Sequence, residues 1–302
     1  MAIIVTNNVE QSNAITHAGL FHADDVFASV FLERLFGELR LFRTFNVPED
    51  VKEDVLVFDI GGGKFDHHQK EGNGMRRNGI KYASFGLLWK EFGRDYLRTI
   101  LEEQFIDAVW KMIDGRIVQP IDAADCGQYP KSDKIPVTTI TSIIRGFNPK
   151  WDEEECYDER FVQACDVARV LFDNALRELI ANAKAEAFVN EAIDNCAGSK
   201  FLILEKFAPW QKYVFLNPKA KEMVYIIFPS MRGGYNVQVI PVGFNNNDAR
   251  KAFPNEWAGL NDQKFKEVTG IEDARFCHPD GFIAGVDTLK GAIALANKAL
   301  ES

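Results

Sequence analysis

In the first half of the chain, apolar runs alternate with segments whose apolar residues recur at helical spacing. The run 55–60 (VLVFDI) is apolar on both faces and ends at three glycines, which is typical of a central parallel strand. Asp24 and Asp25 precede an apolar segment that Gly37 ends, as expected of helix boundaries. Three helices are predicted, over residues 26–36, 84–92 (ended by Gly93) and 97–114. This order predicts an α/β layer built on a parallel sheet.

The pattern changes in the second half. Residues 157–195 contain neither Gly nor Pro and carry apolar residues at helical spacing, which predicts one long connecting helix or two. Four short strand-like runs and a last helix follow: 201–204, 213–216, 223–228, 236–241 and 289–300. We therefore expect two domains, a first one over 1–195 that includes the connecting helix and a smaller α+β domain over 196–302.

Composition and charge restrict the class of protein. The 302 residues are 46% hydrophobic and 26% charged, which is a globular composition and excludes a disordered chain. With 35 basic and 44 acidic residues the formal charge is −9, so the protein does not coat nucleic acid through its whole surface. One cleft could still bind phosphate if metal ions or a basic cluster reverse the sign there.

The cysteines and the N-terminus indicate a cellular compartment. Five scattered cysteines without a CxxC pair suggest neither a disulfide framework nor a zinc knuckle. The sequence shows no basic region followed by a long apolar stretch, and no apolar run of membrane-spanning length. A reducing cytoplasm is the expected location, with no membrane partner.

Four of the five histidines fall in two compact groups with aspartates. A third acidic set lies downstream, so the candidate metal ligands form three groups: His17, His22, Asp24 and Asp25; Asp59, Asp66, His67 and His68; Asp122 and Asp125. Imidazole and carboxylate together suit Mn²⁺, Zn²⁺ or Fe²⁺, and one carboxylate can bridge two ions. Loops at the carboxyl ends of parallel strands are where α/β proteins build such sites.

Each group also has a structural interpretation. His17 alone could be a solvated loop side chain, and Asp24 and Asp25 could only cap a helix. Asp59 is harder to explain structurally, because a carboxylate at the end of so apolar a run is costly unless it is paired or binds metal. The joint occurrence of the groups therefore favours a metal site.

Seven motifs in order resemble the Myg (melanocyte-proliferating gene) family, which is similar to a branch of the DHH phosphoesterase superfamily. They span almost the whole chain: THAGLFHADD at 16–25, FDIGG at 58–62, DHHQ at 66–69, GIKYASFGLLW at 79–89, IDAADCG at 121–127, FPNEWAGL at 253–260 and HPDGFIAG at 278–285. The resemblance implies a DHH-type parallel-sheet domain joined by the long helix to a smaller C-terminal domain, with a metal cleft between them. It also implies phosphodiester hydrolysis, since eukaryotic relatives are RNA exonucleases.

The resemblance also implies residue roles. Asp59 would bridge two ions and the other ligands would divide between them, with His17 and His22 on one ion and Asp24, His67 and Asp125 on the other. His68 would face the phosphate as donor or acid. His22 departs from the DHH pattern, in which many enzymes carry Asp, and imidazole moves the metal preference from Mn²⁺ towards Zn²⁺ or Fe²⁺. The choice between Asp122 and Asp125 as ligand stays open.

Candidate substrate contacts lie in both halves. The basic residues nearest the DHH motif are Arg76, Arg77 and Lys81, which could hold the substrate's other phosphates or form a solvated loop. In the second domain, residues near two glycine-rich turns are similar to a phosphate-holding edge: Arg232 before Gly233 and Gly234, and His278 with Gly281 and Gly285. Without the resemblance, the glycine pair would be interpreted as a hairpin turn.

The leading hypothesis is a metal-dependent, exonuclease-like phosphoesterase. It would hydrolyse short RNA or oligonucleotides with a water activated by two divalent ions, with Mn²⁺ favoured over Zn²⁺ or Fe²⁺. One alternative is a small-molecule hydrolase, such as a pyrophosphatase or nucleotide phosphoesterase; a metallopeptidase is weakened by the absence of HExxH. Another is a metal- or nucleotide-binding protein without turnover. A homodimer through the long helix also stays open, because the same apolar face could pack within the chain.

Overall fold

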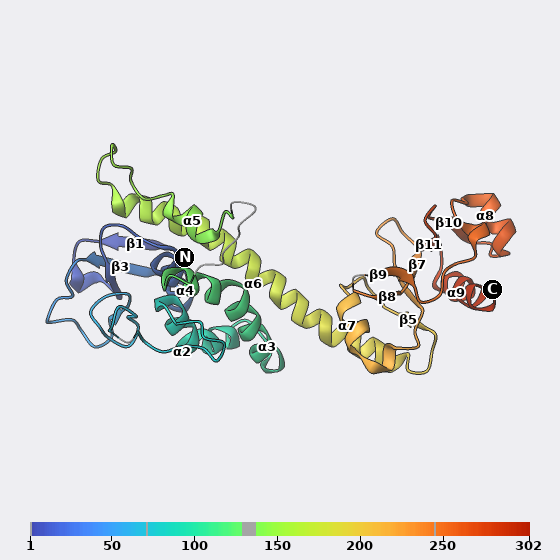
Figure 1. Ribbon diagram of the computed structural model, residues 1–302, viewed down its shortest axis with the longest axis horizontal. Coiled ribbons are helices and arrows are strands. Elements are labelled where there is room, and N and C mark those ends of the chain that lie inside the picture. Colours follow the sequence, from blue (N-terminus) through green and yellow to red (C-terminus); the bar gives the residue numbers. More distant parts are fainter. Residues whose placement is uncertain (1, 71, 129–136, 245) are drawn as a thin grey trace. The chain divides into compact units, whose positions relative to one another are not determined.

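The computed structural model describes residues 2–70, 72–128, 137–244 and 246–302. The chain is a mixed α/β protein and divides into two compact units, Met1–Ile180 and Ala181–Ser302 (Figure 1). This division lies within the long helix α6 (Tyr157–Asn195), whereas the sequence places the domain boundary just after that helix.

A four-stranded parallel sheet forms the centre of the first unit. Its order is β1-β3-β2-β4, with all neighbouring strands parallel: β1 (Ile3–Thr6), β2 (Ala14–His17), β3 (Leu39–Thr44) and β4 (Leu56–Val57). Ile15 and Leu41 on the two inner strands are fully buried. Because parallel strands end at the same edge of a sheet, β2, β3 and β4 deliver their following loops to one place.

The strand expected at 55–60 is shorter than predicted and is not central. Only Leu56–Val57 pairs, along β2, and both residues are half-buried because β4 is an edge strand. The backbone of Phe58 still donates to Ile15 O at 3.0 Å, but Asp59 then adopts a left-handed conformation with φ 58°. This backbone conformation ends the strand, so Asp59 no longer continues the pairing with β2. Strands β2 and β3 take the interior positions, and the sequence analysis identified neither β3 nor the other edge strand, β1.

Helix α1 (Ala23–Phe36) follows β2 and ends at Gly37 as predicted. Helix α2 (Ser84–Arg98) differs, because it continues through Gly93 instead of ending there. A Cβ at Gly93 would lie 2.8 Å from Trp89 Cδ2 and 2.9 Å from Trp110 Nε1. Gly93 therefore allows two indole rings to approach the helix, and it does not act as a terminator.

The remaining helices of the first unit are shorter than the predicted 97–114 segment. Helix α3 (Glu103–Ile113) begins six residues later than predicted, and a π-helical turn over Asp114–Val118 joins it to α4 (Gln119–Asp125). Helix α5 (Ile140–Arg145) precedes α6.

The long helix α6 is a single helix over the range predicted. In the first unit its Phe161 and Phe172 are buried, with the ring of Phe161 5.4 Å from Phe21 and that of Phe172 6.3 Å from Phe85. In the second unit its Val189 belongs to a buried core cluster. The apolar face that the sequence left open to a dimer is therefore buried within the chain.

The second unit is built on a five-stranded mixed sheet of order β10-β11-β7-β6-β5. The strands are β5 (Phe201–Ile203), β6 (Tyr225–Pro229), β7 (Tyr235–Val239), β10 (Ala274–Cys277) and β11 (Ile283–Val286), and β8 (Pro241–Gly243) pairs separately with β9 (Asn246–Ala249). Tyr225 and Ile227 of β6 face a core that includes residues of α8 (Asp262–Thr269) and α9 (Leu289–Glu301). The alternate residues of β6 face a second core with α6 and α7 (Gln211–Leu216).

The strand predicted at 213–216 was wrong, since these residues belong to helix α7. Tyr213 and Val214 are buried, and the Tyr213 hydroxyl donates to Asn182 O of α6 at 2.8 Å. Four consecutive apolar residues carry no periodicity that separates a strand from a helical turn, and packing on α6 decides the outcome.

Candidate metal centre

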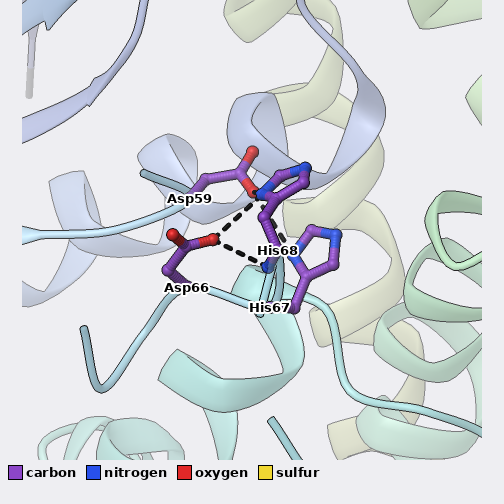
Figure 2. A group of neighbouring side chains, drawn as sticks. All are labelled: Asp59, Asp66, His67 and His68. Carbon is purple, nitrogen blue, oxygen red and sulfur yellow. Dashed lines mark hydrogen bonds and ion pairs between the residues drawn. The ribbon is translucent and has the colours of Figure 1, made fainter. Parts of the chain in front are cut away.

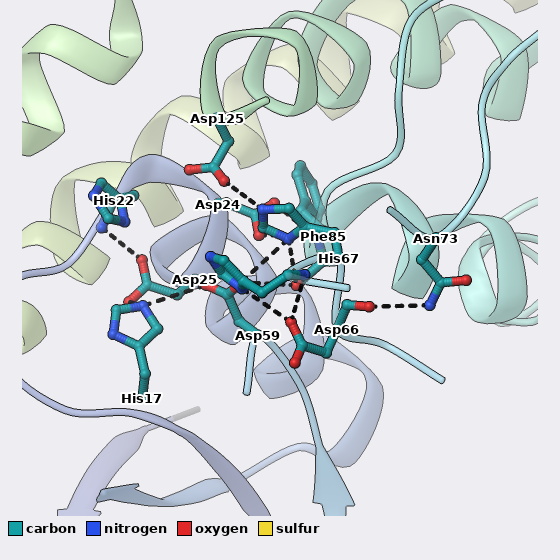
Figure 3. Close-up of polar contacts among 12 residues, drawn as sticks. His17, His22, Asp24, Asp25, Asp59, Asp66, His67, Asn73, Phe85 and Asp125 are labelled. Carbon is teal, nitrogen blue, oxygen red and sulfur yellow. Dashed lines mark hydrogen bonds and ion pairs between the residues drawn. The ribbon is translucent and has the colours of Figure 1, made fainter. Parts of the chain in front are cut away.

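The candidate ligands of the first unit converge at the carboxyl edge of the parallel sheet (Figure 3). His17 is the last residue of β2, and Asp24 and Asp25 lie in the first turn of α1. Asp59 follows β4, and His67 lies in the loop beyond it. Segments far apart in sequence therefore meet because each follows a strand that ends at this edge.

Asp59 lies between two histidines. Its Oδ2 is 3.3 Å from His17 Nε2, and its Oδ1 is 3.3 Å from His67 Nδ1 and accepts a 3.0 Å hydrogen bond from Ser84 Oγ. The residue is 3% exposed. Burial alone would raise its pKa, but the hydrogen bonds and positive charges of the two histidines hold the pKa well below its usual range. Asp59 thus presents one oxygen to each side of the site.

One side consists of His17, Asp25 and Asp59, whose ligand atoms lie within 4.8 Å of one another. Asp25 is fully buried; its Oδ1 accepts from the backbone N–H of His22 at 2.8 Å, while its Oδ2 lies 3.2 Å from His17 Nε2. Oδ2 has no well-aligned hydrogen bond among the described residues. Asp25 therefore caps helix α1 with one oxygen and faces the site with the other.

The histidine on this side is strongly affected by the carboxylates. Burial lowers the pKa of His17, but hydrogen bonds and charges of Asp25 and Asp59 raise it to about 11. The proton on His17 compensates two negative charges, as a bound cation would.

The other side consists of Asp24, His67 and Asp125, again within 4.8 Å. His67 Nε2 is 2.9 Å from Asp125 Oδ2. Asp24 is fully buried and accepts from the backbone N–H groups of Ser84 (2.9 Å) and Phe85 (2.8 Å) at the start of α2. Burial and the charges of Asp59 and Asp125 raise the pKa of Asp24.

His67 is likewise cationic in this setting. Burial lowers its pKa, but hydrogen bonds to Asp125 and Asp59 and the charge of Asp24 raise it to about 11. The two sides therefore share the same composition, with one imidazole, one buried carboxylate of α1 and access to further carboxylate oxygens.

A third group, overlapping the others at Asp59 and His67, includes Asp66 and His68 (Figure 2). Asp66 Oδ1 accepts from the His68 backbone N–H at 3.0 Å and lies 2.9 Å from His68 Nδ1. Its Oδ2 accepts from Gly62 N at 2.7 Å, inside the glycine turn. The His68 side chain is 58% exposed and its ring lies 4.1 Å from that of His67. With Nδ1 engaged by Asp66, Nε2 is the nitrogen of His68 left for a ligand.

His22 lies at the rim of the site and outside these three groups. It is the exposed N-cap of α1, and its ring centroid lies 6.0 Å from that of His17. The resemblance assigned a ligand role to His22 and none to Asp25, although Asp25 belongs to the first group of candidate ligands in the sequence. The structure brings Asp25 to His17 instead, and the adjacent DD pair at the helix start was the only signal for it.

Asp122 is not grouped with the metal-binding candidates, whereas Asp125 is. Asp122 Oδ1 accepts from Gly86 N at 3.0 Å, and its Oδ2 lies 2.7 Å from Arg76 Nη1. Arg76 is buried and also pairs with Asp114, with Nη2 2.7 Å from Oδ1. The guanidinium predicted to hold substrate phosphate is thus bound to two carboxylates of the protein. Arg77 is exposed.

A cavity of about 250 Å³ borders the site beside His67. Its lining comes from the loop after the glycine turn, the segment before α2 and the end of α4: His67, Gln69, Lys70, Gly72, Lys81, Tyr82 and Cys126. Lys70 and Lys81 are exposed, and no ion pair or side-chain hydrogen bond of either ammonium group is found within the described part of the chain. The cavity therefore offers two uncommitted positive charges next to a cluster of carboxylates.

The predicted contacts of the second unit lie at opposite ends of its strands. Arg232 is exposed in the turn between β6 and β7, next to Tyr235, which pairs with Val286 at the end of β11. His278 lies in the turn that precedes β11, where Gly281 has φ 64°. The structure therefore does not bring Arg232 to His278 and Gly281, although the sequence analysis placed them on one edge.

The residues at the carboxyl edge fit divalent cations. Imidazoles and carboxylates are the donors that Mn²⁺, Zn²⁺ and Fe²⁺ share. Asp25 Oδ2 is a buried oxygen without a well-aligned donor in the part of the chain that the structure describes. The two ligand groups hold four carboxylates (Asp24, Asp25, Asp59 and Asp125) and two histidines. The buried Asp/His clusters could thus hold metal ions.

Comparison with known proteins covers nearly the whole chain. The family model MYG1_exonuc, of an uncharacterised protein family (UPF0160), matches residues 13–300. The MYG1 protein C27H6.8 of Caenorhabditis elegans is 31% identical over 95% of this chain and 94% of its own. The MYG1 protein C694.04c of Schizosaccharomyces pombe is 29% identical (95% and 96%), and the MYG1 exonuclease of Mus musculus 26% (94% and 84%).

No solved structure matches the chain. Among the described helices, none combines the length and apolarity needed to cross a membrane.

Proposed function

Because the chain belongs to the MYG1_exonuc family, we propose that it is a metal-dependent phosphodiesterase that shortens RNA or other short oligonucleotides from one end. Relatives of this family carry the name exonuclease in mammals, which supports a nucleic-acid substrate here. The Myg resemblance drawn from the sequence motifs is confirmed. The DHH-type architecture of the first unit and a cytoplasmic site of action are part of the proposal, and the five free cysteines are compatible with a reducing compartment.

The observation that carries the proposal is the position of Asp59 between two ligand groups. His17 and Asp25 lie on its Oδ2 side, while His67 lies on its Oδ1 side, with Asp24 and Asp125 beyond. A carboxylate that offers one oxygen to each of two such groups is the arrangement expected of a bridging ligand in a two-metal site.

We assign the metal ligands to His17, Asp25, Asp59, Asp24, His67 and Asp125, with His22 at the rim. When bound, two divalent ions would lower the pKa of a water towards neutrality and offset the charge that develops on the phosphoryl oxygens. Mn²⁺ is the favoured ion, because carboxylates outnumber imidazoles in this set.

The protein's own residues position the phosphodiester and manage its protons. Hydrolysis joins the oxygen of water to phosphorus and breaks the bond to the leaving oxygen, which then needs a proton. His68 is placed to supply it from Nε2, because Asp66 holds Nδ1 at 2.9 Å and the rest of the ring is exposed. Ser84 orients the centre by donating to Asp59 Oδ1.

Phosphates next to the scissile one are assigned to the basic cavity. Lys81 and Lys70 line it beside His67, and Arg77 is exposed nearby in sequence. In the second unit, Arg232 and the turn with His278 and Gly281 are proposed as separate contacts for more distant parts of the substrate, since they lie at opposite ends of the strands.

The test is Mn²⁺-dependent hydrolysis of an end-labelled short RNA by the wild type and by Asp59→Asn. Asn tolerates the left-handed backbone that Asp59 adopts, so the variant should keep the fold and lose the charge. Asp262→Asn is the matched control, because Asp262 also has a positive φ (45°) and is exposed in the other unit. Stepwise shortening by the wild type and Asp262→Asn alone is the expected result.

Other outcomes point to the alternatives. Release of phosphate from pyrophosphate or a mononucleotide, with intact RNA, would show a small-molecule hydrolase that uses the same cavity. Metal binding without turnover of any of these substrates, with Zn²⁺ and Fe²⁺ also tried, would leave a binding protein.

A further inference from the structure

An aromatic ring stands exposed at the edge of the sheet that carries the candidate metal centre. Phe45 follows β3 directly and is 75% exposed. Half of the phenylalanines of the first unit are buried in its core, where burial removes their apolar surface from water and stabilises the fold. Phe45 lacks this stabilisation, and it lies at the edge of the sheet where the candidate metal ligands converge.

The ring lies against a neighbouring turn, and hydrogen bonds hold the backbone on both sides of this contact. A Cβ at Gly19 would lie 3.2 Å from Phe45 Cε1, so the ring rests against the backbone of that glycine. The turn that presents Phe45 is tied by Thr44, whose Oγ1 donates to Asn46 O at 2.9 Å and accepts from Asn46 N at 3.3 Å. Gly19 is fixed as well, since its carbonyl accepts from Arg43 Nη2 at 2.9 Å. A preorganised ring loses little conformational entropy when a flat ligand stacks on it.

The same loop leads directly to the metal centre. Gly19 is two residues from His17, and His17 pairs with Thr44 in the β2–β3 ladder, where Ala18 N donates to Thr44 O at 2.9 Å. His17 contacts Asp59 Oδ2, whereas His67, at the border of the lysine cavity, contacts Asp59 Oδ1. Phe45 is therefore linked to the cavity through the strand pair of Thr44 and His17, and then through the contacts of Asp59 with His17 and His67.

We propose that Phe45 is a base-stacking subsite for one nucleotide of the substrate on the His17 side of the metal centre. The inference rests on the proposed function, because it takes the phosphodiester to lie at Asp59 with its charge towards the lysine cavity. A nucleobase is the flat, uncharged part of that substrate, and stacking on an exposed aromatic ring accepts any base. Phe45 offers no hydrogen-bonding group, so it would favour a base at this position without selecting its identity.

The experiment compares intact RNA pentamers with pentamers that carry one abasic residue at each position in turn. For the wild type, removal of the one base that stacks on Phe45 should lower kcat/KM about 10-fold, and removal of a base elsewhere should not. Phe45→Ala should lose about 10-fold on intact RNA and lose nothing more when that base is absent. Phe45→Trp should keep both the rate and the position dependence.

Phe36→Ala is the matched control. Phe36 is also partly exposed (41%) in the same unit, but it ends α1, whose first turn carries Asp24 and Asp25. Its loss should leave kcat/KM unchanged on every pentamer. The thermal midpoint of each variant checks that exposed positions were changed without unfolding.

Binding separates this inference from the proposed function. The same pentamers are titrated against Asp59→Asn with and without Phe45→Ala, with fluorescence anisotropy as readout. A Kd penalty of Phe45→Ala that disappears at one abasic position supports stacking even if no RNA is cleaved. An equal penalty on intact RNA and on every abasic pentamer, or no penalty at all, overturns it.

Discussion

The carboxylate of Asp122 occupies the position beside Gly86, at the start of helix α2, that a side chain at residue 86 would need. The backbone N–H of Gly86 donates to Asp122 Oδ1 at 3.0 Å, and a Cβ on Gly86 would lie 1.8 Å from Asp122 Oδ2. Asp122 is held in turn by Arg76, 2.7 Å away. The glycine is therefore required by a buried ion pair, which fixes the helix end whose Ser84 contacts Asp59.

Gly86→Ala should push Asp122 away and disturb the start of α2. We expect a loss of about 1–3 kcal/mol in the free energy of unfolding, the usual cost of an overpacked interior, together with weaker metal binding. Denaturant unfolding with the metal chelated measures the first effect. Gly115→Ala is the control, because a Cβ there would meet nothing within 4 Å; a loss as large as that of Gly86→Ala would contradict the prediction.

Asp25→Asn should lower metal affinity at least 10-fold, because one of its oxygens faces His17 and Asp59. His17→Ala should do the same, whereas His22→Ala should cost less, since His22 lies outside the ligand groups. Calorimetric titration with Mn²⁺ gives the three affinities. Equal losses for His17→Ala and His22→Ala would return His22 to the ligand set.

Metal uptake should release protons. Burial lowers the pKa values of His17 and His67, but the neighbouring carboxylates outweigh it and raise both to about 11. Both histidines are therefore protonated at pH 7 in the metal-free protein. A ligand imidazole must lose its proton, and apparent affinity should therefore rise with pH. Titration in two buffers of different ionisation enthalpy counts the protons. The same heat in both buffers would contradict the prediction.

The metal-free protein should show the opposite trend in stability. A histidine whose pKa is higher in the folded state stabilises the fold fully below its unfolded pKa of about 6.5, and this contribution is lost as the pH rises through about 11. The thermal midpoint with chelator present should fall from pH 7 towards pH 10. His17→Gln should flatten this fall, and an unchanged slope in that variant would assign the effect to other groups.

Lys81→Ala should raise KM for an oligonucleotide roughly 10-fold with little change in kcat, as expected when one charged phosphate contact is removed. The ammonium lines the cavity beside His67 and is not committed to another side chain of the described structure. Added salt should reduce the difference between variant and wild type. Lys52→Ala removes an exposed lysine that pairs with Glu10 at 3.4 Å, and it should leave KM as it was.

The sequence located the site well because its ligands lie in short motifs. His17 ends a strand, Asp59 and His67 follow a strand or a glycine turn, and parallel topology brings such positions together. The role of Asp25 could not be separated from that of Asp24, since both open the same helix and only the packing of α2 shows which oxygens are occupied.

Other predictions depended on contacts between residues far apart in the sequence, which the local pattern does not show. Arg76 looked like a free cation, but its partners are 38 and 46 residues away, at Asp114 and Asp122. Gly93 resembled a helix end because a glycine within a helix and a glycine after one look alike until the neighbouring tryptophans are placed. The turns of Arg232 and His278 are both rich in glycine, but they lie at opposite ends of the strands. Only the register of the strands determines this placement.

The hydrogen bonds at the start of α2 affect the order in which metal and substrate bind. The N–H groups of Ser84, Phe85 and Gly86, which at other helix ends bind phosphate, are all taken by carboxylates of Asp24 and Asp122. An incoming anion then finds these three N–H donors already occupied, so its charge has to be met by cations bound in the neighbouring ligand groups. Substrate and metal should therefore add in a compulsory sequence, metal first, and the apparent KM for the nucleic acid should depend on the metal concentration.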